Sequence, residues 1–331
     1  MPVTRRPWVD LHAHPGRCFL AGLDVADPLV SRLGGAEIGA QMAAAATAGM
    51  AAITLSTVAD LRVLAPDAAK GLTASREFGP GEAYGDHRRQ LDAMLAVLAA
   101  LGVLVAVSAA ELERAWSGGR TAALLSCEGG DFLEGRLEAL AEARAAGVSS
   151  LTLVHYRVNE IGDVQTEEPV HGGLTGFGRD VVAECNRLGL IIDCAHATFQ
   201  TTLGVLETSS QPVMVSHSHL DHAGRPHPRL LSRDHAMAVA SAGGVIGAWP
   251  SGVVSTSLAD FADEVARLAD LVGADHVAIG TDLDANYRPV LRSYADFASL
   301  PQLLAERGFS EADCDQILGA SALRLLQAVA D

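Results

Sequence analysis

Short apolar runs recur along the chain and alternate with helix-length segments rich in Ala, Leu, Glu and Arg. The runs cover residues 7–13, 50–58, 102–107, 121–127, 148–155, 189–195, 212–217, 243–249 and 275–281. Buried strands that alternate with helices predict parallel β-α units. Gly147, Gly189 and Gly243 stand where a helical segment ends and the next strand begins, the position at which glycine adopts the left-handed conformation.

Polar residues capable of chemistry stand at the carboxyl ends of many predicted strands. They are His14, Glu128, His155, His196, His217 and Asp282. In a (β/α)₈ barrel these ends form one rim where active sites are built, whereas a doubly wound sheet concentrates its site at one switch point. The spread over many strands therefore favours an α/β chain folded as a (β/α)₈ TIM-type barrel, with residues 1–331 as a single domain.

Nine candidate strands exceed the eight that a barrel needs. We expect the run at 102–107 to be a short strand outside the barrel wall. Stretches rich in glycine, proline and polar residues at 60–86, 156–177 and 218–233 are predicted to be loops over the rim. Loops in these places would form the substrate pocket.

The charge balance excludes some partners. Lys and Arg number 24 against 40 Asp and Glu, a net charge of −16, and no arginine-rich cluster offers a nucleic-acid footprint. We expect no nucleic-acid partner and no membrane partner. The start of the chain has no signal-peptide pattern, no 18-residue uncharged apolar run follows, and the five cysteines lack a CxxC spacing. These features predict a soluble cytoplasmic protein.

Lysine is nearly missing from the chain. The only lysine is Lys70, which lies in a Pro-, Gly- and Asp-rich stretch. Schiff-base catalysis, phosphate binding by a P-loop and metal bridging by a carbamylated lysine all need a placed lysine. The composition argues against all three chemistries.

The segment Asp10–Gly16 (sequence DLHAHPG) contains the strongest candidate for a metal site. His12 and His14 project from the same face of a strand, roughly 7 Å apart at Cβ, within reach of one metal ion. An isolated His-X-His pair is more often ordinary packing, but further histidines and carboxylates end later strands. Asp10, two residues before His12, would point inwards and support the ligands.

Four imidazoles and carboxylates at strand ends suit two divalent cations such as Zn²⁺. With lysine excluded, Glu128 is the natural bridge between the ions. We assign His12, His14 and Glu128 to one metal, and Glu128, His196 and His217 to the other. A hydroxide held between the metals would be the nucleophile, and Asp282 would take its proton and pass it to a leaving amine. Asp284, two residues on, could share that role.

An ordered set of motifs resembles the membrane (renal) dipeptidase family of the amidohydrolase superfamily. The motifs are His12/His14, Glu128-Gly129-Gly130, Leu151–His155, Ile192–His196, Val215–Ser218, His227-Pro228-Arg229, Gly280-Thr281-Asp282 and, near the end of the chain, residues 308–324. The resemblance runs nearly end to end. It implies a homodimeric binuclear zinc barrel that hydrolyses dipeptides.

The same resemblance implies roles for two further residues. His155 would polarise the scissile carbonyl and help bind substrate, although a hydrogen-bonded core histidine is the alternative. Arg229 would hold the terminal carboxylate of the substrate, because a guanidinium binds carboxylate bidentately and Pro228 stiffens its loop. Arg225 and Arg233 are rivals for this role a few residues away.

The chain departs from the family pattern at three positions. His14 stands where the family usually has Asp, and Leu230 and Ser321 stand where it usually has Asn. A neutral His14 leaves the predicted site one positive charge richer than Asp would. We therefore expect a more electrophilic site that binds anionic groups more readily. The strand ending in Trp249-Pro250 also lacks the usual polar and tyrosine pattern.

Three functions compete. The leading hypothesis is a binuclear zinc dipeptidase that acts on a dipeptide or small peptide-like substrate with a free carboxylate. The nearest alternative is an amidohydrolase-superfamily hydrolase of another amide, lactam or modified peptide. A non-catalytic metal-holding scaffold is the third, and it is disfavoured because it has little need for Asp282 and Arg229.

Overall fold

Eight parallel strands close into a barrel in the computed structural model, which describes residues 7–67, 71–224 and 226–330. The strands are β1 (Trp8–Asp10), β2 (Met50–Val58), β5 (Ala122–Glu128), β6 (Val148–Thr152), β7 (Ile191–Asp193), β8 (Met214–Ser218), β9 (Val245–Ala248) and β10 (Val277–Ile279). Their order around the barrel is β1-β10-β9-β8-β7-β6-β5-β2. The predicted (β/α)₈ barrel is confirmed. Lys70 and Arg225 lie outside the described residues.

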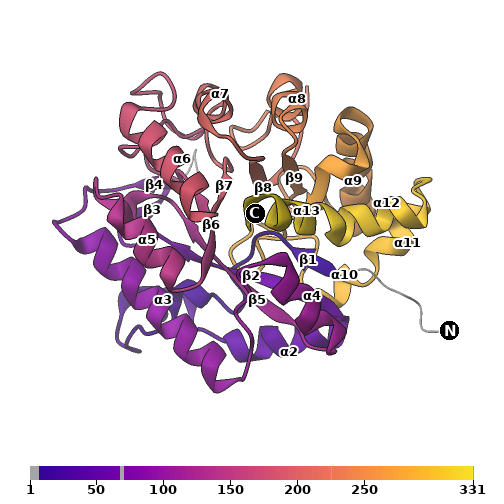
Figure 1. Ribbon diagram of the computed structural model, residues 1–331, viewed down its shortest axis with the longest axis horizontal. Coiled ribbons are helices and arrows are strands. Elements are labelled where there is room, and N and C mark those ends of the chain that lie inside the picture. Colours follow the sequence, from indigo (N-terminus) through magenta and orange to yellow (C-terminus); the bar gives the residue numbers. More distant parts are fainter. Residues whose placement is uncertain (1–6, 68–70, 225, 331) are drawn as a thin grey trace.

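Helices surround the barrel and follow the strands in chain order (Figure 1). The α-helices are α1 (Pro28–Leu33), α2 (Ile38–Ala48), α3 (Glu82–Ala100), α4 (Ala109–Ser117), α5 (Glu138–Ala145), α6 (Gly176–Leu188), α7 (Phe199–Thr208), α8 (Arg233–Ser241), α9 (Leu258–Val272), α10 (Tyr294–Phe297), α11 (Leu300–Ala305), α12 (Glu311–Asp315) and α13 (Ser321–Ala330). The described elements also include short 3₁₀ turns, η1 (Cys18–Leu20), η2 (Asp131–Leu133) and η3 (Ala274–His276), and one π turn, η4 (Gln316–Ala320).

The glycines predicted to end helices do so. Gly189 closes α6 in the left-handed conformation at φ 66°, and its amide bonds back to the last turn of the helix. Gly147 and Gly243 also have positive φ, 98° and 78°; Gly147 lies directly before β6, and Gly243 lies two residues before β9. Only glycine adopts these angles without strain, so each helix ends where the next strand must begin.

The amino-terminal opening of the barrel is closed by apolar side chains. Helix α13 crosses in front of the barrel centre in Figure 1. Leu325, Leu326 and Val329 of this helix share a hydrophobic cluster with residues of all the barrel strands except β6, among them Val9 and Val245. This end is a packed plug, so the polar strand ends at the opposite rim face the accessible opening.

The structure differs in detail from two of the expectations drawn from the sequence. Residues 102–107 stay outside the barrel wall as expected, but they do not form the expected short strand: Val105 makes only one isolated bridge to Ala123. The stretch 60–86, expected to be a loop, contains the antiparallel hairpin of β3 (Leu64–Asp67) and β4 (Gly71–Ala74) and the start of α3. Its prolines and glycines predicted a loop, but a proline such as Pro66 is tolerated in a two-stranded ribbon, where every strand is an edge.

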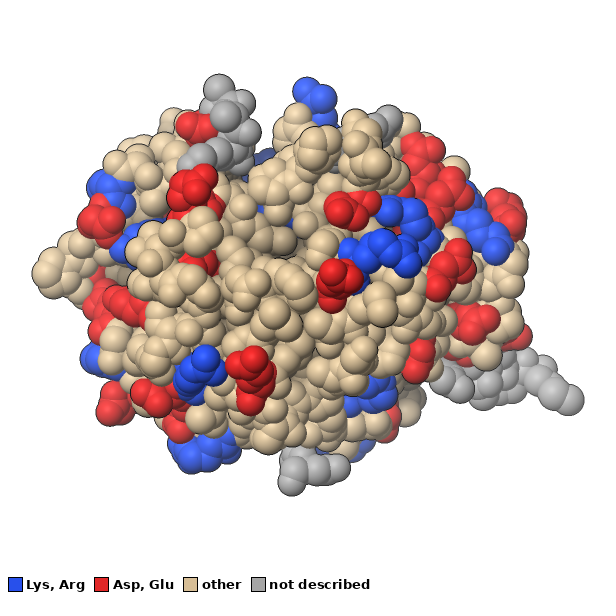
Figure 2. Space-filling model, turned by 90° about the horizontal axis from the view of Figure 1, so that it is seen from above, with Lys and Arg blue, Asp and Glu red and all other residues tan. Residues whose placement is uncertain are grey.

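Charged side chains are dispersed over the surface. On the face shown in Figure 2, acidic and basic residues alternate around a broad neutral area. The net charge of −16 is therefore not gathered into one patch on this face. None of the helices in the described ranges has both the length and the apolar character to span a membrane.

The close approach of β8, β9 and β10 predicts a strong effect of adding one methyl group. A Cβ at Gly247 would lie 1.8 Å from the carbonyl oxygen of Ser216, whereas a Cβ at Gly85 in α3 would meet nothing within 4 Å. We expect Gly247→Ala to cost about 2 kcal/mol or more. Gly85→Ala should be neutral or stabilising by up to about 1 kcal/mol. Thermal unfolding followed by circular dichroism measures both, and equal midpoints would contradict the packing described.

Candidate metal centre and substrate pocket

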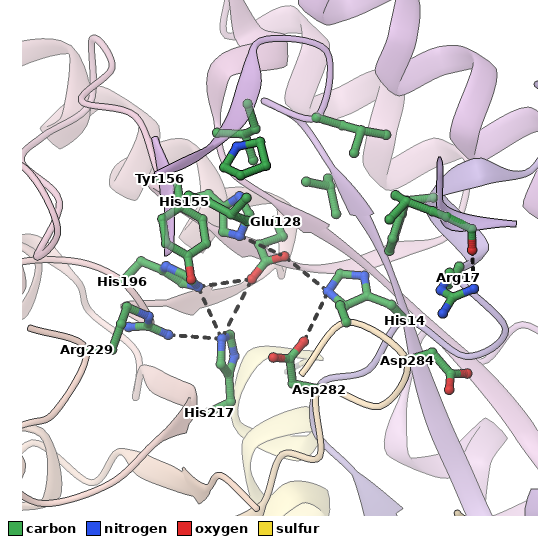
Figure 3. A pocket seen from close by; sticks show the side chains of 18 of the residues that line it. His14, Arg17, Glu128, His155, Tyr156, His196, His217, Arg229, Asp282 and Asp284 are labelled. Atoms are coloured by element: carbon green, nitrogen blue, oxygen red, sulfur yellow. Dashed lines mark hydrogen bonds and ion pairs between the residues drawn. The ribbon is translucent and has the colours of Figure 1, made fainter. Parts of the chain in front are cut away.

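The barrel brings the predicted site residues to one rim. Glu128 is the last residue of β5, and His217 lies in β8. The others lie in the loops that directly follow β1, β6, β7 and β10: His12, His14, His155, His196 and Asp282. Because all barrel strands are parallel, these positions meet above the same opening (Figure 3).

The carboxylate of Glu128 is the centre of the cluster. Its Oε1 lies 3.3 Å from Nε2 of His12 and 3.2 Å from Nε2 of His196. Its Oε2 lies 3.2 Å from Nε2 of His14, and His217 Nε2 is 3.7 Å from Oε1. Two groups of three ligand atoms result, one with the His12 and His14 pair and one with the His196 and His217 pair, and Glu128 belongs to both.

The donor atoms fit divalent ions. Nε2 of His12 and Nε2 of His14 are 3.3 Å apart, and those of His196 and His217 are 3.2 Å apart, so each pair aims its nitrogens at a common point. Imidazole nitrogens and a carboxylate oxygen are the ligands that zinc accepts. A carboxylate that is only 2% exposed also needs nearby positive charge, which a bound cation would supply.

The electrostatics favour the metal-binding forms of His196, His217 and Glu128 but not that of His14, because its contacts with Cys18 and Glu128 outweigh burial and raise the pKa of His14 well above its usual value. Burial lowers the pKa of His196 and of His217 well below the usual value, and the charge of Arg229 lowers both further. Burial raises the pKa of Glu128, but the charges of His155 and His12 outweigh it and hold that pKa well below its usual value. Neutral imidazole and ionised carboxylate are the states that bind metal.

Hydrogen bonds fix two of the rings. His14 Nδ1 lies 3.1 Å from the carbonyl oxygen of Ser56, and His217 Nδ1 lies 2.9 Å from the hydroxyl of Ser216. Such contacts on the far nitrogen select the ring orientation that points Nε2 at the ion.

Two buried aspartates tie strands together beneath the cluster. Asp10 accepts hydrogen bonds from the hydroxyl of Thr281 at 2.5 Å and from its amide at 2.9 Å, and burial raises the pKa of Asp10 to about 6. Asp193 accepts from the hydroxyls of Ser216 and Thr152, both at 2.6 Å. Asp10 was expected to support the ligands. The sequence reasoning missed Asp193, although it too lies at the end of a strand, three residues before the candidate ligand His196.

Asp282 faces the cluster from the end of β10. Its Oδ1 lies 3.5 Å from His14 Nε2, and its Oδ2 accepts a hydrogen bond of 3.2 Å from the indole N–H of Trp249. Burial raises the pKa of Asp282. Asp282 and His196 both have positive φ, 53° and 66°, a conformation that side chains other than glycine adopt at a cost. Backbone strain thus coincides with two residues of the candidate site.

His155 is held by an aspartate that the sequence analysis missed. Its Nδ1 lies 2.7 Å from Oδ1 of Asp60, and its Nε2 lies 3.5 Å from Oε2 of Glu128. The second oxygen of Asp60 accepts a hydrogen bond from the amide of Tyr156 at 3.0 Å. The only signal in the sequence was the position of Asp60, two residues after the apolar run at 50–58.

Arg229 lies beside the histidine cluster, at the wall of the cavity. Its side chain is 2% exposed, and burial lowers its pKa. One guanidinium nitrogen is 3.0 Å from His217 Nε2, and another donates to the side-chain oxygen of Gln165 at 2.7 Å. Its Cζ lies 5.6 Å from the centre of the Trp249 ring. Arg233, a rival from the sequence, is exposed at the start of α8.

A cavity of about 410 Å³ is lined by the cluster and by rim residues. Apart from the ligands, its walls include Tyr156, Arg229, Trp249 and Asp282, with Arg17 at the far side (Figure 3). A second cavity of about 800 Å³ adjoins it. The residues that line both are Leu72, Tyr156, Trp249, Asp282 and Ala285. Both volumes are in the range of small-molecule sites.

Solved structures define the class of fold to which this barrel belongs. A metallo peptidase from Rhodobacter sphaeroides, liganded with a phosphinate mimic of the dipeptide L-Ala-D-Ala, superposes with a TM-score of 0.81 at 20% identity over 98% of this chain and 99% of that chain. An amidohydrolase from Pseudomonas aeruginosa gives a TM-score of 0.77 at 20% identity over 98% and 96% of the two chains. These proteins share the barrel fold of this chain.

The sequence narrows this class to one family. Residues 35–331 match the family described as membrane dipeptidase (peptidase family M19). Dipeptidase aclJ of Aspergillus oryzae is 34% identical over 220 residues, which cover 63% of this chain and 52% of that protein. Dipeptidase tcpJ of Claviceps purpurea is 30% identical over 238 residues, covering 69% and 55%. The chain belongs to the membrane dipeptidase family, and it spans about half the length of these relatives.

The cluster predicts metal-dependent stabilisation. We expect excess zinc to raise the thermal midpoint of the metal-free protein, because an ion that binds only the folded state at 100 times its Kd adds about 2.7 kcal/mol. Glu128→Gln should lose most of this shift, since both groups of ligands share that carboxylate. His222→Ala is the matched control, because His222 pairs with Glu264 away from the cluster. Equal zinc shifts in all three proteins would contradict a site centred on Glu128.

Proposed function

We propose that this protein is a binuclear zinc dipeptidase. The observation that carries the proposal is the single buried carboxylate of Glu128 shared by two histidine pairs, with Asp282 and Arg229 facing the same cavity. His12, His14 and Glu128 would hold one ion, and Glu128, His196 and His217 the other. When bound, the two ions would supply Lewis acidity and a water that is nucleophilic at neutral pH.

Arg229 would bind the carboxylate at the end of the substrate. Its guanidinium is buried at one wall of the cavity and donates to the neutral side chain of Gln165, so the carboxylate of a substrate could pair with it directly. A charged carboxylate on a desolvated guanidinium is among the strong hydrogen-bonded pairs. The ring of Trp249 beneath the guanidinium limits its freedom to turn away.

His155 and Asp282 would act on the peptide bond. Asp60 accepts from Nδ1 of His155, and the charges of Asp60 and Glu128 outweigh burial and raise the pKa of His155, so the protonated ring can also donate from Nε2 to a carbonyl oxygen that gains negative charge. Asp282 would accept the proton of the attacking water and deliver it to the leaving amine. Its raised pKa suits a group that takes up and releases a proton.

The Arg229 assignment predicts a substrate-dependent loss. Replacing the guanidinium in Arg229→Gln should lower kcat/KM for dipeptides about 10- to 100-fold, because a charged hydrogen-bonded pair is lost. The same dipeptides with a C-terminal amide should be poor substrates of the parent protein, and the substitution should leave their kcat/KM nearly unchanged. An equal loss of kcat/KM for dipeptide acids and dipeptide amides would show that Arg229 does not bind the C-terminal carboxylate.

The Asp282 assignment predicts a loss confined to the chemical step. Asp282→Asn should lower kcat by about 10² to 10⁴, the range for removing a general acid or base, while the metal content measured by mass spectrometry is retained. Asp284→Asn is the matched control in the same loop, since the Asp284 carboxylate accepts a backbone hydrogen bond from Gly16. A loss of kcat in Asp284→Asn alone would move the role to that residue.

The alternative remains a hydrolase of another amide, lactam or modified peptide. The adjoining cavity of about 800 Å³ favours it, because that space exceeds the needs of a simple dipeptide. A panel of L-L and L-D dipeptides, assayed with and without a chelator, distinguishes the dipeptidase from this alternative. Chelator-sensitive hydrolysis supports the dipeptidase, and no hydrolysis by the metal-loaded protein supports the alternative.

A further inference from the structure

The cavity has two chemically different ends. Arg229 lies at one side and Arg17 at the opposite side, with Glu128 between them (Figure 3). Around the Arg17 side the wall is apolar. It is built by side chains from η1, α1, the end of β2 with the turn after it, and the β3-β4 hairpin: Phe19, Leu33, Val58, Leu61, Leu64 and Leu72. We call this set the apolar wall.

The apolar wall is a packed part of the structure. Phe19, Val58 and Leu61 are between 5% and 8% exposed and form a hydrophobic cluster of their own, against which Leu33 packs. The ring of Phe19 also meets the ring of His14 edge to face, with centroids 5.3 Å apart. The wall therefore borders the metal centre directly on the His14 side.

The hairpin that carries the rest of the apolar wall is anchored. The hydroxyl of Thr73 in β4 donates to the carboxylate of Glu167 at 2.8 Å, which ties the hairpin to the neighbouring rim loop. Leu64 and Leu72, which lie on β3 and β4, are half-buried and line the cavity. A ligand side chain placed there would bury them further.

Two of the three charged groups beside the apolar wall are bonded to the backbone, and the third is exposed. Arg17 donates to the carbonyl oxygen of Leu33 and is otherwise exposed. Asp284 accepts from the amide of Gly16 at 2.5 Å. Arg32, the third charged residue of this side, is exposed on α1. These contacts hold the loop together and leave the wall suited to an apolar group.

We propose that the preferred substrate is a dipeptide whose N-terminal residue carries a bulky apolar side chain, which packs against the apolar wall. This rests on the proposed function, in which Arg229 holds the C-terminal carboxylate. With the carboxylate at that end and the peptide bond beside Glu128, the N-terminal residue extends toward the opposite side. Two extended residues span roughly 7 Å, so the side chain of the N-terminal residue lies well away from the C-terminal carboxylate.

Burial of the side chain gives the expected size of the preference. Removing a leucine or phenylalanine side chain from water corresponds to about a 10- to 100-fold gain in binding. We expect kcat/KM for Leu-Ala and Phe-Ala to exceed that for Gly-Ala by at least about tenfold. The reversed dipeptides Ala-Leu and Ala-Phe should show no such gain. A preference for Glu-Ala, or one that follows the second residue, would overturn the proposal.

Substitutions in the apolar wall test directly whether it causes the preference for an apolar N-terminal residue. Leu64→Ser and, as a second variant, Leu72→Ser should each reduce the ratio of kcat/KM for Phe-Ala over Gly-Ala at least threefold. Leu101→Ser is the matched control, because Leu101 is 48% exposed at the end of α3 and does not line the cavity. An unchanged ratio in both wall variants would overturn the proposal.

Binding measured without turnover separates this inference from the proposed function. Calorimetric titration of zinc-loaded Asp282→Asn with Phe-Ala, Gly-Ala and Ala-Phe should give the lowest Kd for Phe-Ala, by about tenfold. If the parent protein hydrolyses the dipeptides at rates that do not depend on the first residue, the proposed role of the apolar wall is refuted and the dipeptidase proposal stands. If binding to Asp282→Asn follows the first residue but the parent protein hydrolyses none of the dipeptides, the role of the apolar wall stands and the dipeptidase proposal is refuted. If neither binding nor hydrolysis is seen, both proposals are refuted.

Discussion

One buried carboxylate organises the functional end of this molecule. Glu128 ends β5, where it pairs in register with Val58 of β2 and Thr152 of β6, so its backbone is fixed on both sides. Its side chain meets imidazoles that come from the loops after β1 and β7 and from β8, strands that do not neighbour β5. Only a closed barrel brings those strands to face one another across the opening. A charge this deeply buried is costly unless cations or hydrogen-bond donors surround it, and the rim supplies them.

The groups beneath and around the cluster limit its freedom. Asp10 and Asp193 join neighbouring strands through hydroxyl and amide donors, so the loops that carry the histidines start from fixed points. Trp249 contacts both Asp282 and Arg229, and it therefore orients the acid and the guanidinium together. Polar groups buried to this extent reduce stability unless each is paired. Their concentration at one rim, opposite an apolar plug at the other end, is the pattern expected where stability is given up for chemistry.

The pocket combines a charged end and an apolar end on either side of the candidate metal centre. Arg229 is buried among polar partners, whereas the opposite side is formed by the apolar wall and by charged residues that are bonded to backbone or exposed. For the proposed peptide substrate, such an arrangement would favour one direction of binding, because the two ends of the pocket differ in charge and in side-chain chemistry. The cavity next to it, shared through Tyr156 and Trp249, leaves room for groups larger than a simple side chain.

The sequence by itself determined the barrel and most of the residues at its centre. Alternating apolar runs and helical segments follow from local periodicity, and His12, His14, Glu128, His196, His217 and Asp282 stand at or near strand ends, which all parallel barrel strands bring to one rim. Tertiary structure decided the rest. Asp60, Trp249 and Gln165 act through contacts between loops far apart in sequence, which no local pattern encodes. The hairpin of β3 and β4 and the choice of Arg229 over Arg233 also depended on packing, because several conformations satisfy the same local sequence and only burial against the barrel selects one.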